Sequence, residues 1–296
     1  MNRQTADTPR PPVRQDYRHL ERLRVRWAEV DLQKIVFNGH YLMYLDTAVA
    51  GWWRAMALPY QATMDALGGD LYVRKATLDY TASARYDELI DVGIKTLHIG
   101  NASMRVGAAV FRGDQLLVTG ELVYVYANPA TQTALPVPQV LRDVLAAFEA
   151  GQAMVDVRLG GWDALGAAAG AIRAAVFVDE QKIAAALEWD GADAQCVHAL
   201  VSNRLGRALA TGRLMPALGG VSRIGRMAVL APMRGGRIGS AVLAALVQAA
   251  RSRGDSRVLL HAQLSAAGFY SRAGFVAQGP LFSEAGIAHQ AMVRAL

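Results

Sequence analysis

Cysteine is almost absent from this sequence, in which Cys196 is the one thiol among 296 residues. A single cysteine excludes a disulfide within the chain and is typical of a protein kept in a reducing compartment. Cys196 stands beside Val197 in a mixed run, so we expect a buried structural thiol rather than a nucleophile. These features predict a cytoplasmic protein.

Long apolar runs and targeting signals are lacking as well. No run of about 18 apolar residues is free of charged side chains, so we expect no membrane span. The first 17 residues, MNRQTADTPRPPVRQDY, are polar and contain no apolar core of a secretory signal. We expect residues 1–17 to form a disordered arm, and no motif of the sequence predicts a metal site.

Acidic residues are comparatively scarce in the second half of the chain. Residues 1–150 carry 16 basic and 16 acidic side chains, whereas residues 151–296 carry 15 and 9. A basic domain is typical of proteins that bind nucleic acid. The arginines are not clustered with aromatic residues, however, and a small anionic ligand explains them as well. We therefore expect no nucleic-acid partner.

One stretch of the second half has the form of a phosphate-binding loop. Met227–Leu230 is a short apolar run typical of a strand, Pro232–Gly236 breaks it, and Ile238–Arg253 predicts a helix that ends at Gly254. Such a loop brings backbone N–H groups together, and the helix N-terminus adds about half a unit of positive charge. The alternative is that glycine loops also join strand and helix in many α/β units that bind nothing.

The first half predicts one buried helix and an antiparallel sheet. Tyr41–Met56 is apolar on most faces, and Pro59 ends it. Strand-like runs surround this helix and are separated by turn residues. The expected strands are Arg22–Trp27, Leu71–Asp79, Leu89–Ile99, Ser103–Arg112 and Gln115–Ala127. With a closing helix at Val140–Ala150, the pattern indicates an α+β domain.

The pattern starts again after Gly151, where we place the domain boundary between residues 18–150 and 151–296. Trp162–Leu187 predicts a largely helical segment, and strands and one short helix surround the loop described above. The further expected elements are strands at Met154–Leu159, Cys196–Asn203, Arg207–Leu214, Val258–Ala262, near Phe275 and at Ala288–Val293, and a helix at Ala266–Ser271. The second domain is therefore expected to be a mixed α/β domain.

The stretch RVRWAEVDLQKIVFNGHYLMYLD resembles the hotdog-fold thioesterases of the 4-hydroxybenzoyl-CoA thioesterase type. Members show a strand, an Asp in a short loop, and a Tyr that starts the long central helix; here these residues are Asp31 and Tyr41. The later stretch YVRKATLDYTASARYDELIDV is similar to the family's second strand and the loop after it. The resemblance covers roughly residues 20–140 and implies a central helix wrapped by an antiparallel sheet.

The hotdog resemblance implies a thioesterase site around Asp31. In this family the Asp is a nucleophile or general base toward the thioester carbonyl, which N–H groups at the start of the central helix polarise. Asn38, His40 and Tyr41 are further candidates for the thioester site. Hotdog domains form this site between two subunits, so a dimer or higher oligomer is implied. The residues leave other roles open, because Asp is a common signal before a helix and His40 fits a solvated first turn.

The sequence departs from this family at two positions. Lys34 stands three residues after Asp31, where members commonly have Gly, and Asn38 stands where many have His.

The stretch GRMAVLAPMRGGRIGSAVL is similar to the acetyl-CoA-binding motif R/Q-x-x-G-x-G/A of the GNAT superfamily of N-acetyltransferases. The motif runs from Arg234 to Gly239, with Arg237 at the central glycine, and we expect Arg237 to adopt a helical conformation that keeps the backbone cradle. Downstream, HAQLSAAGFYSRAGF matches the family's N-x-x-A-x-x-L-Y-x-x-x-G-F, with Gln263 and Tyr270. IRAAVFVDEQ and FSEAGIAHQAM are similar to the subgroup that includes small ElaA-like acyltransferases.

The GNAT resemblance implies direct attack of an amine on acetyl-CoA, with coenzyme A as part of a substrate. Tyr270 is the implied general acid toward the departing thiolate, and its alternative is a packing role in a short helix. The residues implied to hold coenzyme A are Met227, Ala228, Val229, Arg234, Gly235, Gly236, Arg237, Ile238, Gly239, Ser240 and Gln263. The general base stays open between Glu180, His261 and His289, and Trp189 and Asp190 are expected on the acceptor side.

Two hypotheses follow from the two resemblances. The first is a bifunctional enzyme, an acyl-CoA thioesterase fused to an N-acyltransferase. The second is that one domain, more readily the hotdog domain, is non-catalytic and serves as a CoA-sensing or oligomerising module. The sequence names neither the acyl chain nor the acceptor amine.

Overall fold

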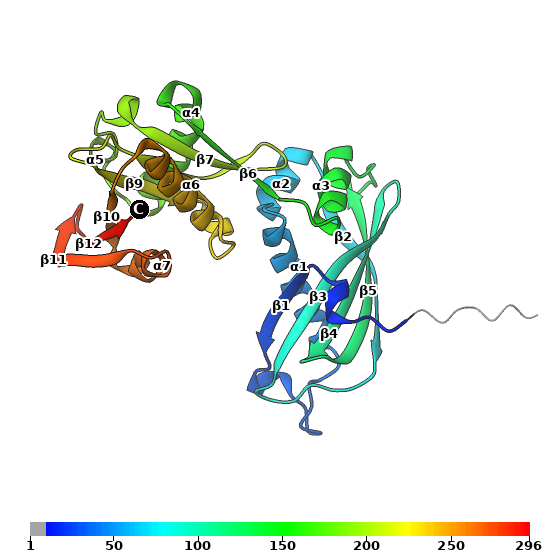
Figure 1. The fold of residues 1–296 in the computed structure, drawn as a ribbon. Helices are drawn as coiled ribbons and strands as arrows, with labels where there is room; N and C mark the ends of the chain where they lie inside the picture. Colours follow the sequence, from blue (N-terminus) through cyan, green and yellow to red (C-terminus); the bar gives the residue numbers. More distant parts are fainter. Residues whose placement is uncertain (1–9) are drawn as a thin grey trace, which may run out of the picture. The chain divides into compact units, whose positions relative to one another are not determined.

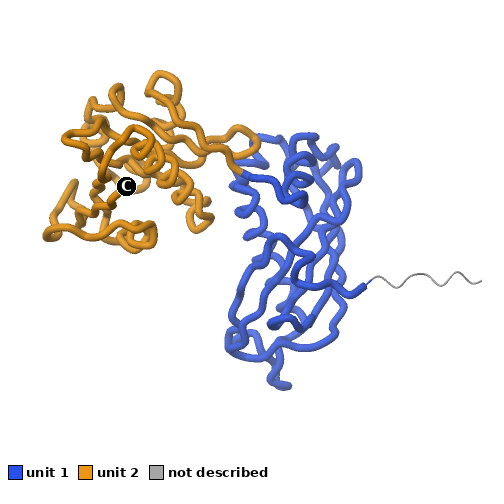
Figure 2. The backbone as a smooth tube through the Cα atoms, viewed as in Figure 1, with its two compact units in different colours: residues 1–154 blue, residues 155–296 orange. Residues whose placement is uncertain are grey.

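The chain forms two compact units, Met1–Met154 and Val155–Leu296, in the computed structural model (Figure 2). The structure describes residues 10–296. Each unit is built on a sheet of its own (Figure 1). Within the described residues, no helix is both long and apolar enough to cross a membrane.

The first unit contains a five-stranded antiparallel sheet in the order β1-β3-β4-β5-β2. The strands are β1 (His19–Arg24), β2 (Asp70–Tyr80), β3 (Leu89–Ile99), β4 (Ser103–Arg112) and β5 (Gln115–Ala127). The predicted bounds of β3, β4 and β5 are confirmed, because hairpin turns end these strands sharply. The predicted strand Arg22–Trp27 is wrong at both ends, since β1 starts at His19 and Trp27 begins a 3₁₀ turn.

Helix α1 (His40–Ala55) packs against β1 and β3 and buries Tyr44, Leu45 and Trp52. Gly51 allows this close approach, because a Cβ atom at this position would lie 2.8 Å from the His19 Nε2 atom. Helix α3 (Gln139–Glu149) closes the unit, as predicted for Val140–Ala150, and one of its faces is strongly apolar. The sequence analysis missed helix α2 (Tyr60–Leu67), which starts directly after Pro59.

The prediction of a disordered arm over residues 1–17 is wrong for residues 14–17; residues 1–9 lie outside the described part. Arg14–Asp16 forms a 3₁₀ turn, and the Arg14 guanidinium lies 2.5 Å from the Asp91 carboxylate. Tyr17 is 7% exposed and meets Phe111 edge-to-face at 5.9 Å. Aromatic burial therefore attaches this segment to the sheet despite its polar sequence.

The second unit contains a seven-stranded sheet in the order β11-β12-β10-β9-β8-β7-β6. The strands are β6 (Val155–Gly160), β7 (Val197–Asn203), β8 (Ala208–Leu214), β9 (Val221–Val229), β10 (Arg257–Gln263), β11 (Val276–Glu284) and β12 (Ile287–Ala295). Neighbouring strands pair in the antiparallel sense except β9 and β10, which are parallel and joined by helix α6 (Ile238–Arg253). The predicted bounds of α6 are confirmed, since Gly254 ends it in the left-handed conformation with φ 86°.

The predicted helical segment Trp162–Leu187 divides into three parts. Helix α4 (Trp162–Arg173) continues into a π-helical stretch, Ala174–Glu180, and α5 (Ala185–Glu188) follows. Leu165, Ala169 and Ile172 of α4 pack in one buried cluster with Leu200 and Ala228 of the sheet. Single π turns inside helices are frequent at functional sites, and this one ends at Glu180 beside the predicted acetyl-CoA loop.

Candidate functional site

Strands β9 and β10 separate in the middle of the second sheet. Their parallel ladder pairs Val221–Ile224 with Arg257–Leu260 and stops there, although β9 continues to Val229 and β10 to Gln263. Arg226 lies at this point with a positive φ of 52°. Two strands that separate leave backbone groups unpaired and open a gap between them, which is the form of site that an extended ligand can enter.

The loop after β9 ends in an open cradle of backbone amides. Gly235 has φ 82° and Arg237 has φ 61°, both left-handed, and α6 begins at Ile238. Among the described residues, no backbone N–H group from Gly235 to Gly239 donates a hydrogen bond to a protein acceptor. Unpaired N–H groups at a helix N-terminus are a binding site for an anion such as a phosphate.

The prediction that Arg237 has a helical conformation is wrong, because its backbone is left-handed rather than right-handed. Arg237 has φ 61° and ψ 8°, the left-handed conformation, and acts as the N-cap of α6. A right-handed residue would extend the helix by one position, whereas the left-handed residue turns the chain directly before the first helical turn. The position has the backbone conformation that Gly adopts most easily, and an Arg occupies it at some cost in conformational energy.

A cavity of about 1000 Å³ lies over this loop and the gap between the strands. Of the residues predicted to hold coenzyme A, most line it. They are Met227, Val229, Arg234, Gly235, Arg237, Ile238, Gly239, Ser240 and Gln263. Tyr270, predicted as general acid, also lines this cavity, whereas Ala228 is buried in the core below and Gly236 is not part of the lining.

A second cavity of about 260 Å³ adjoins the first on the other side of the strand gap. Tyr270, Met227 and Gln263 line both cavities, together with Gln181 and Ala266. The amide Nε2 of Gln263 donates to Oε1 of Gln181 at 2.9 Å, so this junction also ties β10 to the end of the π-helical stretch. A group held in the first cavity can therefore meet a group held in the second at Tyr270.

Tyr270 is suited to donate a proton at this junction. It lies on α7 (Ala267–Arg272), is 8% exposed, and packs against Phe269 and Phe275. Burial raises the pKa of Tyr270 to about 12, so the hydroxyl stays protonated at neutral pH.

Glu180 is one of the three residues predicted as candidates for the general base. In the structure it pairs with Arg234. Its carboxylate forms a two-pronged ion pair with Arg234, with N–O distances of 2.5 and 2.7 Å. Hydrogen bonding to Arg234 lowers the pKa of Glu180, which makes the carboxylate a weaker proton acceptor. Glu180 is also absent from the lining of the second cavity.

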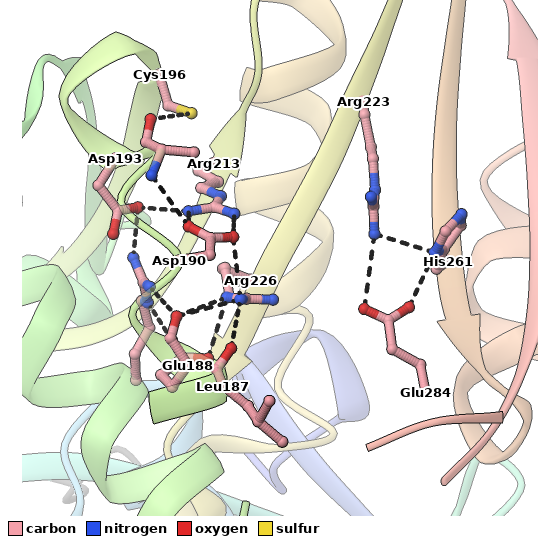
Figure 3. A network of polar contacts seen from close by, with 12 residues as sticks. Leu187, Glu188, Asp190, Asp193, Cys196, Arg213, Arg223, Arg226, His261 and Glu284 are labelled. Atoms are coloured by element: carbon pink, nitrogen blue, oxygen red, sulfur yellow. Dashed lines mark hydrogen bonds and ion pairs between the residues drawn. The ribbon is translucent and has the colours of Figure 1, made fainter. Parts of the chain in front are cut away.

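A buried network of charges, which sequence reasoning missed, supports the point where β9 leaves β10 (Figure 3). Arg226 donates to the main-chain oxygens of Leu187 and Glu188 and pairs with the Asp190 carboxylate at 3.1 Å. Arg213 also binds Asp190, and its hydrogen bonds lower the pKa of that carboxyl. The network therefore stabilises the unusual backbone of Arg226 through side chains far away in the sequence.

The network continues to Arg173, which is 1% exposed and lies against two indole rings. Its guanidinium is 5.5 Å from the Trp162 ring centre and 4.7 Å from that of Trp189, and it binds the carboxylates of Glu188 and Asp193. Trp189 therefore contributes to packing rather than to the cavity lining. No sequence pattern predicts that these residues contact one another, because each one fits its own helix, turn or strand without the others.

The two predicted histidines both line the second cavity. His261 on β10 has its Nδ1 atom 2.9 Å from Oε2 of Glu284 on β11, and Arg223 of β9 approaches both (Figure 3). His289 on β12 is 8% exposed, and its Nδ1 atom lies 2.8 Å from the main-chain oxygen of Ile287. Sheet pairing thus brings both base candidates to one place.

In the first unit, Asp31 lies in a tight loop before α1. Its Oδ1 atom accepts the N–H of Gln33 at 2.8 Å, and the main chain closes the loop through Asp31 N–H to the Ile35 oxygen at 2.9 Å. Lys34 has φ 62° and supplies the left-handed turn at the position where the resembling family has Gly. The loop shape is therefore kept without the glycine.

The other thioester-site candidates differ in their exposure. Tyr41 is 1% exposed, and its hydroxyl accepts the N–H of Ala84 at 2.9 Å, so it has a structural role within this unit. His40 is partly exposed, with Nδ1 3.3 Å from the Met43 sulfur. The main-chain oxygen of Asn38 accepts the Tyr80 hydroxyl at 3.0 Å. Asn38 is thus the most exposed of these residues, Asp31 and His40 are partly exposed, and Tyr41 is buried.

Glu29, which the sequence analysis did not select, anchors the Asp31 loop. It is 2% exposed and accepts hydrogen bonds from the Tyr44 hydroxyl at 2.6 Å and the Arg26 main-chain N–H at 2.7 Å. Although burial raises the pKa of Glu29, these hydrogen bonds outweigh it and lower the pKa.

Cys196, as predicted, is buried, and burial raises the pKa of its thiol. In the described part of the chain, no three His, Cys, Asp or Glu side chains are grouped to hold a metal ion.

Comparisons with known proteins divide the chain at the same two units. Residues 176–296 match the family described as acetyltransferase (GNAT) domain, and residues 33–119 match the thioesterase superfamily. The uncharacterized protein YyaT of Bacillus subtilis is 32% identical over 126 residues, which are 42% of this chain and 84% of that protein.

Two solved structures are similar to one unit each. A "putative N-acetyltransferase" from Lactobacillus plantarum is 31% identical with a TM-score of 0.46, and the alignment covers 49% of this chain and 99% of that one. The 1,4-dihydroxy-2-naphthoyl-CoA thioesterase Slr0204 from Synechocystis is 18% identical with a TM-score of 0.40, and the alignment covers 43% of this chain and 95% of that one.

Proposed function

The chain belongs to the GNAT acetyltransferase family through residues 176–296 and carries a thioesterase-superfamily domain at residues 33–119, and we propose that both domains act on coenzyme A thioesters. The two predicted folds are confirmed, and the chain is an enzyme with an acetyltransferase domain and a thioesterase domain. The proposal adds which residues hold the coenzyme, which carry out the chemistry, and where the substrates enter.

The observation that carries the acetyltransferase proposal is the row of unpaired amides from Gly235 to Gly239. These groups and the α6 N-terminus bind the diphosphate of acetyl-CoA, and the basic excess of the second unit assists them. The pantetheine arm then lies in the gap between β9 and β10, and its thioester reaches Tyr270 at the junction of the two cavities.

The chemistry follows from this arrangement. An amine held in the 260 Å³ cavity attacks the acetyl carbonyl, and Tyr270 protonates the sulfur that leaves. A hydroxyl with a pKa of about 12 remains a donor until the thiolate develops. The acceptor is therefore a small amine whose reactive nitrogen reaches the cavity junction.

In the first unit, Asp31 is the proposed nucleophile or general base of acyl-CoA hydrolysis. Its side chain accepts one N–H from its own loop, which leaves carboxylate lone pairs available for water or a thioester. Among the described residues, the N–H group of Leu42 in the first turn of α1 has no protein acceptor, so it is available to polarise a thioester carbonyl.

A dimer is proposed from the edge of the first sheet. Strand β2 is 11 residues long, stands at the sheet edge, and exposes Val73 at 54% and its neighbours to Thr77. A long exposed edge strand favours pairing with another strand, and a second copy of this unit supplies one of the same length. The proposed thioester site, near the exposed Phe37 and Leu32, then lies between two copies.

A cytoplasmic location is proposed from the free buried thiol of Cys196.

Glycine-selective ¹⁵N labelling of the full-length chain tests the coenzyme site directly. Acetyl-CoA is expected to shift the amide signals of Gly235, Gly236 and Gly239, which lie in the loop, and to leave Gly206 and Gly254 unchanged. Acetyl-pantetheine, which lacks the diphosphate, should bind at least about ten-fold more weakly and leave the loop signals in place. Equal shifts with both compounds, or none with acetyl-CoA, would overturn the assignment.

A further inference from the structure

One cluster in the acceptor cavity has no role in the function proposed so far. It consists of His261 on β10, Glu284 on β11 and Arg223 on β9 (Figure 3). The Glu284 Oε2 atom lies 2.9 Å from His261 Nδ1, and Arg223 Nη2 lies 3.0 Å from the same nitrogen and 3.8 Å from Glu284 Oε1. All three side chains line the 260 Å³ cavity that also contains Tyr270.

The chemistry of the partners determines the tautomer of His261. A carboxylate only accepts hydrogen bonds and a guanidinium only donates, so one ring nitrogen cannot satisfy both. We assign the proton to Nδ1, where it can be donated to the Glu284 carboxylate while Arg223 neutralises the charge of that carboxylate from the side. The other nitrogen, Nε2, then keeps its lone pair, and in Figure 3 it points away from Glu284.

Charged and titratable groups from five elements face His261 or line its cavity. Arg223 and Glu284 contact it directly, and the Phe282 ring meets it edge-on at 4.8 Å and separates it from His289 on β12. Tyr270 of α7 lines the same cavity, as do Glu188 and Arg226. Although burial raises the pKa of Glu284, the hydrogen bond from His261 and the charges of Arg223 and both histidines outweigh it and lower the pKa. An ionised Glu284 stabilises the imidazolium that forms when His261 accepts a proton.

The other acidic or basic candidates are less suited to accept a proton from a substrate. His289 is 8% exposed, and its ring nitrogen is held by a neutral carbonyl, which supports a cation less than a carboxylate does. Glu188 is 3% exposed and is shared between Arg173 and Arg226. The side chain of His261, in contrast, is 27% exposed.

We propose that His261 is the general base of acetyl transfer and that Glu284 is the residue that positions it. The inference rests on the proposed acetyltransferase function. His261 Nε2 takes a proton from the acceptor ammonium, and the freed amine attacks the thioester carbonyl carbon to form the C–N bond. The C–S bond breaks as this intermediate collapses, the sulfur takes the Tyr270 proton, and the nitrogen gives its surplus proton back to Tyr270. One proton remains on His261 and is released to water, so the acceptor ammonium and acetyl-CoA give amide, thiol and one proton.

Acetyl transfer by the full-length chain tests this assignment. A pool of spermidine, tyramine and the common amino acids is incubated with ¹³C-acetyl-CoA, labelled amides are identified by mass spectrometry, and the best acceptor is then used alone. His261→Gln is expected to lower kcat/KM about 100-fold or more and to leave the acetyl-CoA KM unchanged. His98→Gln, an exposed residue of the first unit, is the matched control and should retain full activity.

The pH profile separates a positioning role of Glu284 from a structural one. Glu284→Gln removes the anion that stabilises the imidazolium, so the acidic limb of kcat/KM is expected to move to lower pH while the maximal rate falls about ten-fold. An unchanged limb, or full activity of His261→Gln together with inactivity of His289→Gln, would overturn the proposal.

A spectroscopic measurement is independent of the acceptor. In the ¹⁵N-histidine-labelled chain, neutral His261 is expected to show the Nδ1–H tautomer. An Nε2–H tautomer would contradict the assignment of the base. If no amine of the pool is acetylated while this tautomer is found, the function proposed for the cavity fails and the oriented histidine stands.

Discussion

Arg234 and Glu180 hold each other through two parallel contacts, Nη1 to Oε1 at 2.5 Å and Nη2 to Oε2 at 2.7 Å. Arg234 starts the proposed diphosphate loop, and Glu180 ends the π-helical stretch, 54 residues earlier in the chain. A guanidinium binds phosphate through the same pair of N–H groups that Glu180 occupies here. The carboxylate and the coenzyme therefore compete for Arg234.

Glu180→Gln is expected to strengthen acetyl-CoA binding. The variant frees Arg234 for the diphosphate, and because the ion pair is about half exposed, the gain is limited to roughly two- to five-fold in Kd. Isothermal titration measures it, with Asp179→Asn, the neighbouring acidic residue, as the matched control. Weaker binding in Glu180→Gln would show that the carboxylate orders the loop instead.

Arg237→Gly is expected to stabilise the second unit by about 0.5 kcal/mol. A left-handed φ costs an Arg about 1 kcal/mol that Gly avoids, and the greater flexibility of the unfolded Gly chain offsets part of the gain. Arg237→Val should destabilise by about 1 kcal/mol or more, because a β-branched residue tolerates this conformation poorly. Calorimetry of the thermal transition measures both, and Arg237→Asn controls for the loss of charge. The idea fails if Gly and Val have the same effect.

Tyr270→Phe is expected to slow acetyl transfer about 100-fold with little change in acetyl-CoA affinity. Phe keeps the packing against Phe269 and Phe275 and removes only the proton donor. Steady-state kinetics and titration calorimetry separate the two quantities. An equal loss of affinity and rate would indicate a packing role for the ring.

Asp31→Asn is expected to abolish acyl-CoA hydrolysis by the first unit, with a loss of about 100-fold or more, while the loop keeps its shape. Asn retains the side-chain oxygen that accepts the Gln33 N–H, but it is neither a nucleophile nor a base. Thiol release from a panel of acyl-CoAs without amine measures this, with Asp87→Asn as an exposed control in the same unit. Thiol release that is the same in Asp31→Asn and the unsubstituted chain would remove the thioesterase role from Asp31.

Charges on the β2 edge are expected to separate the proposed dimer. In Val73→Glu/Ala76→Glu, two copies of β2 would place like charges opposite each other, and the dissociation constant should rise at least ten-fold. Light scattering coupled to size exclusion measures the mass. Val140→Glu, which adds a charge on the exposed side of α3, is the control. A chain that is monomeric before substitution, or a dimer that both variants retain, refutes pairing through β2.

Local chemistry made much of the fold predictable. Helix α6 ends at Gly254, and hairpin turns separate β3, β4 and β5. The turn and capping residues of the sequence therefore mark where these elements end. Pro59 follows the end of α1, as predicted, but Pro also starts helices, and the helix α2 that begins directly after it was not predicted. Tyr17 was assigned to a disordered arm because its neighbours are polar, and its packing on Phe111 depends on a strand almost a hundred residues away.

By itself, the sequence determined the two folds and pointed to the proposed acetyl-CoA loop and its residue types, because these depend on patterns within short segments. Tertiary structure decided how those residues act. It set the left-handed turn of Arg237, enclosed Arg173, Arg213 and Arg226 among carboxylates, and placed His261 against Glu284 by pairing β10 and β11 with β12. Proton affinity and hydrogen-bond geometry depend on groups within a few ångströms of each other, and the chain brings such groups together only when it folds.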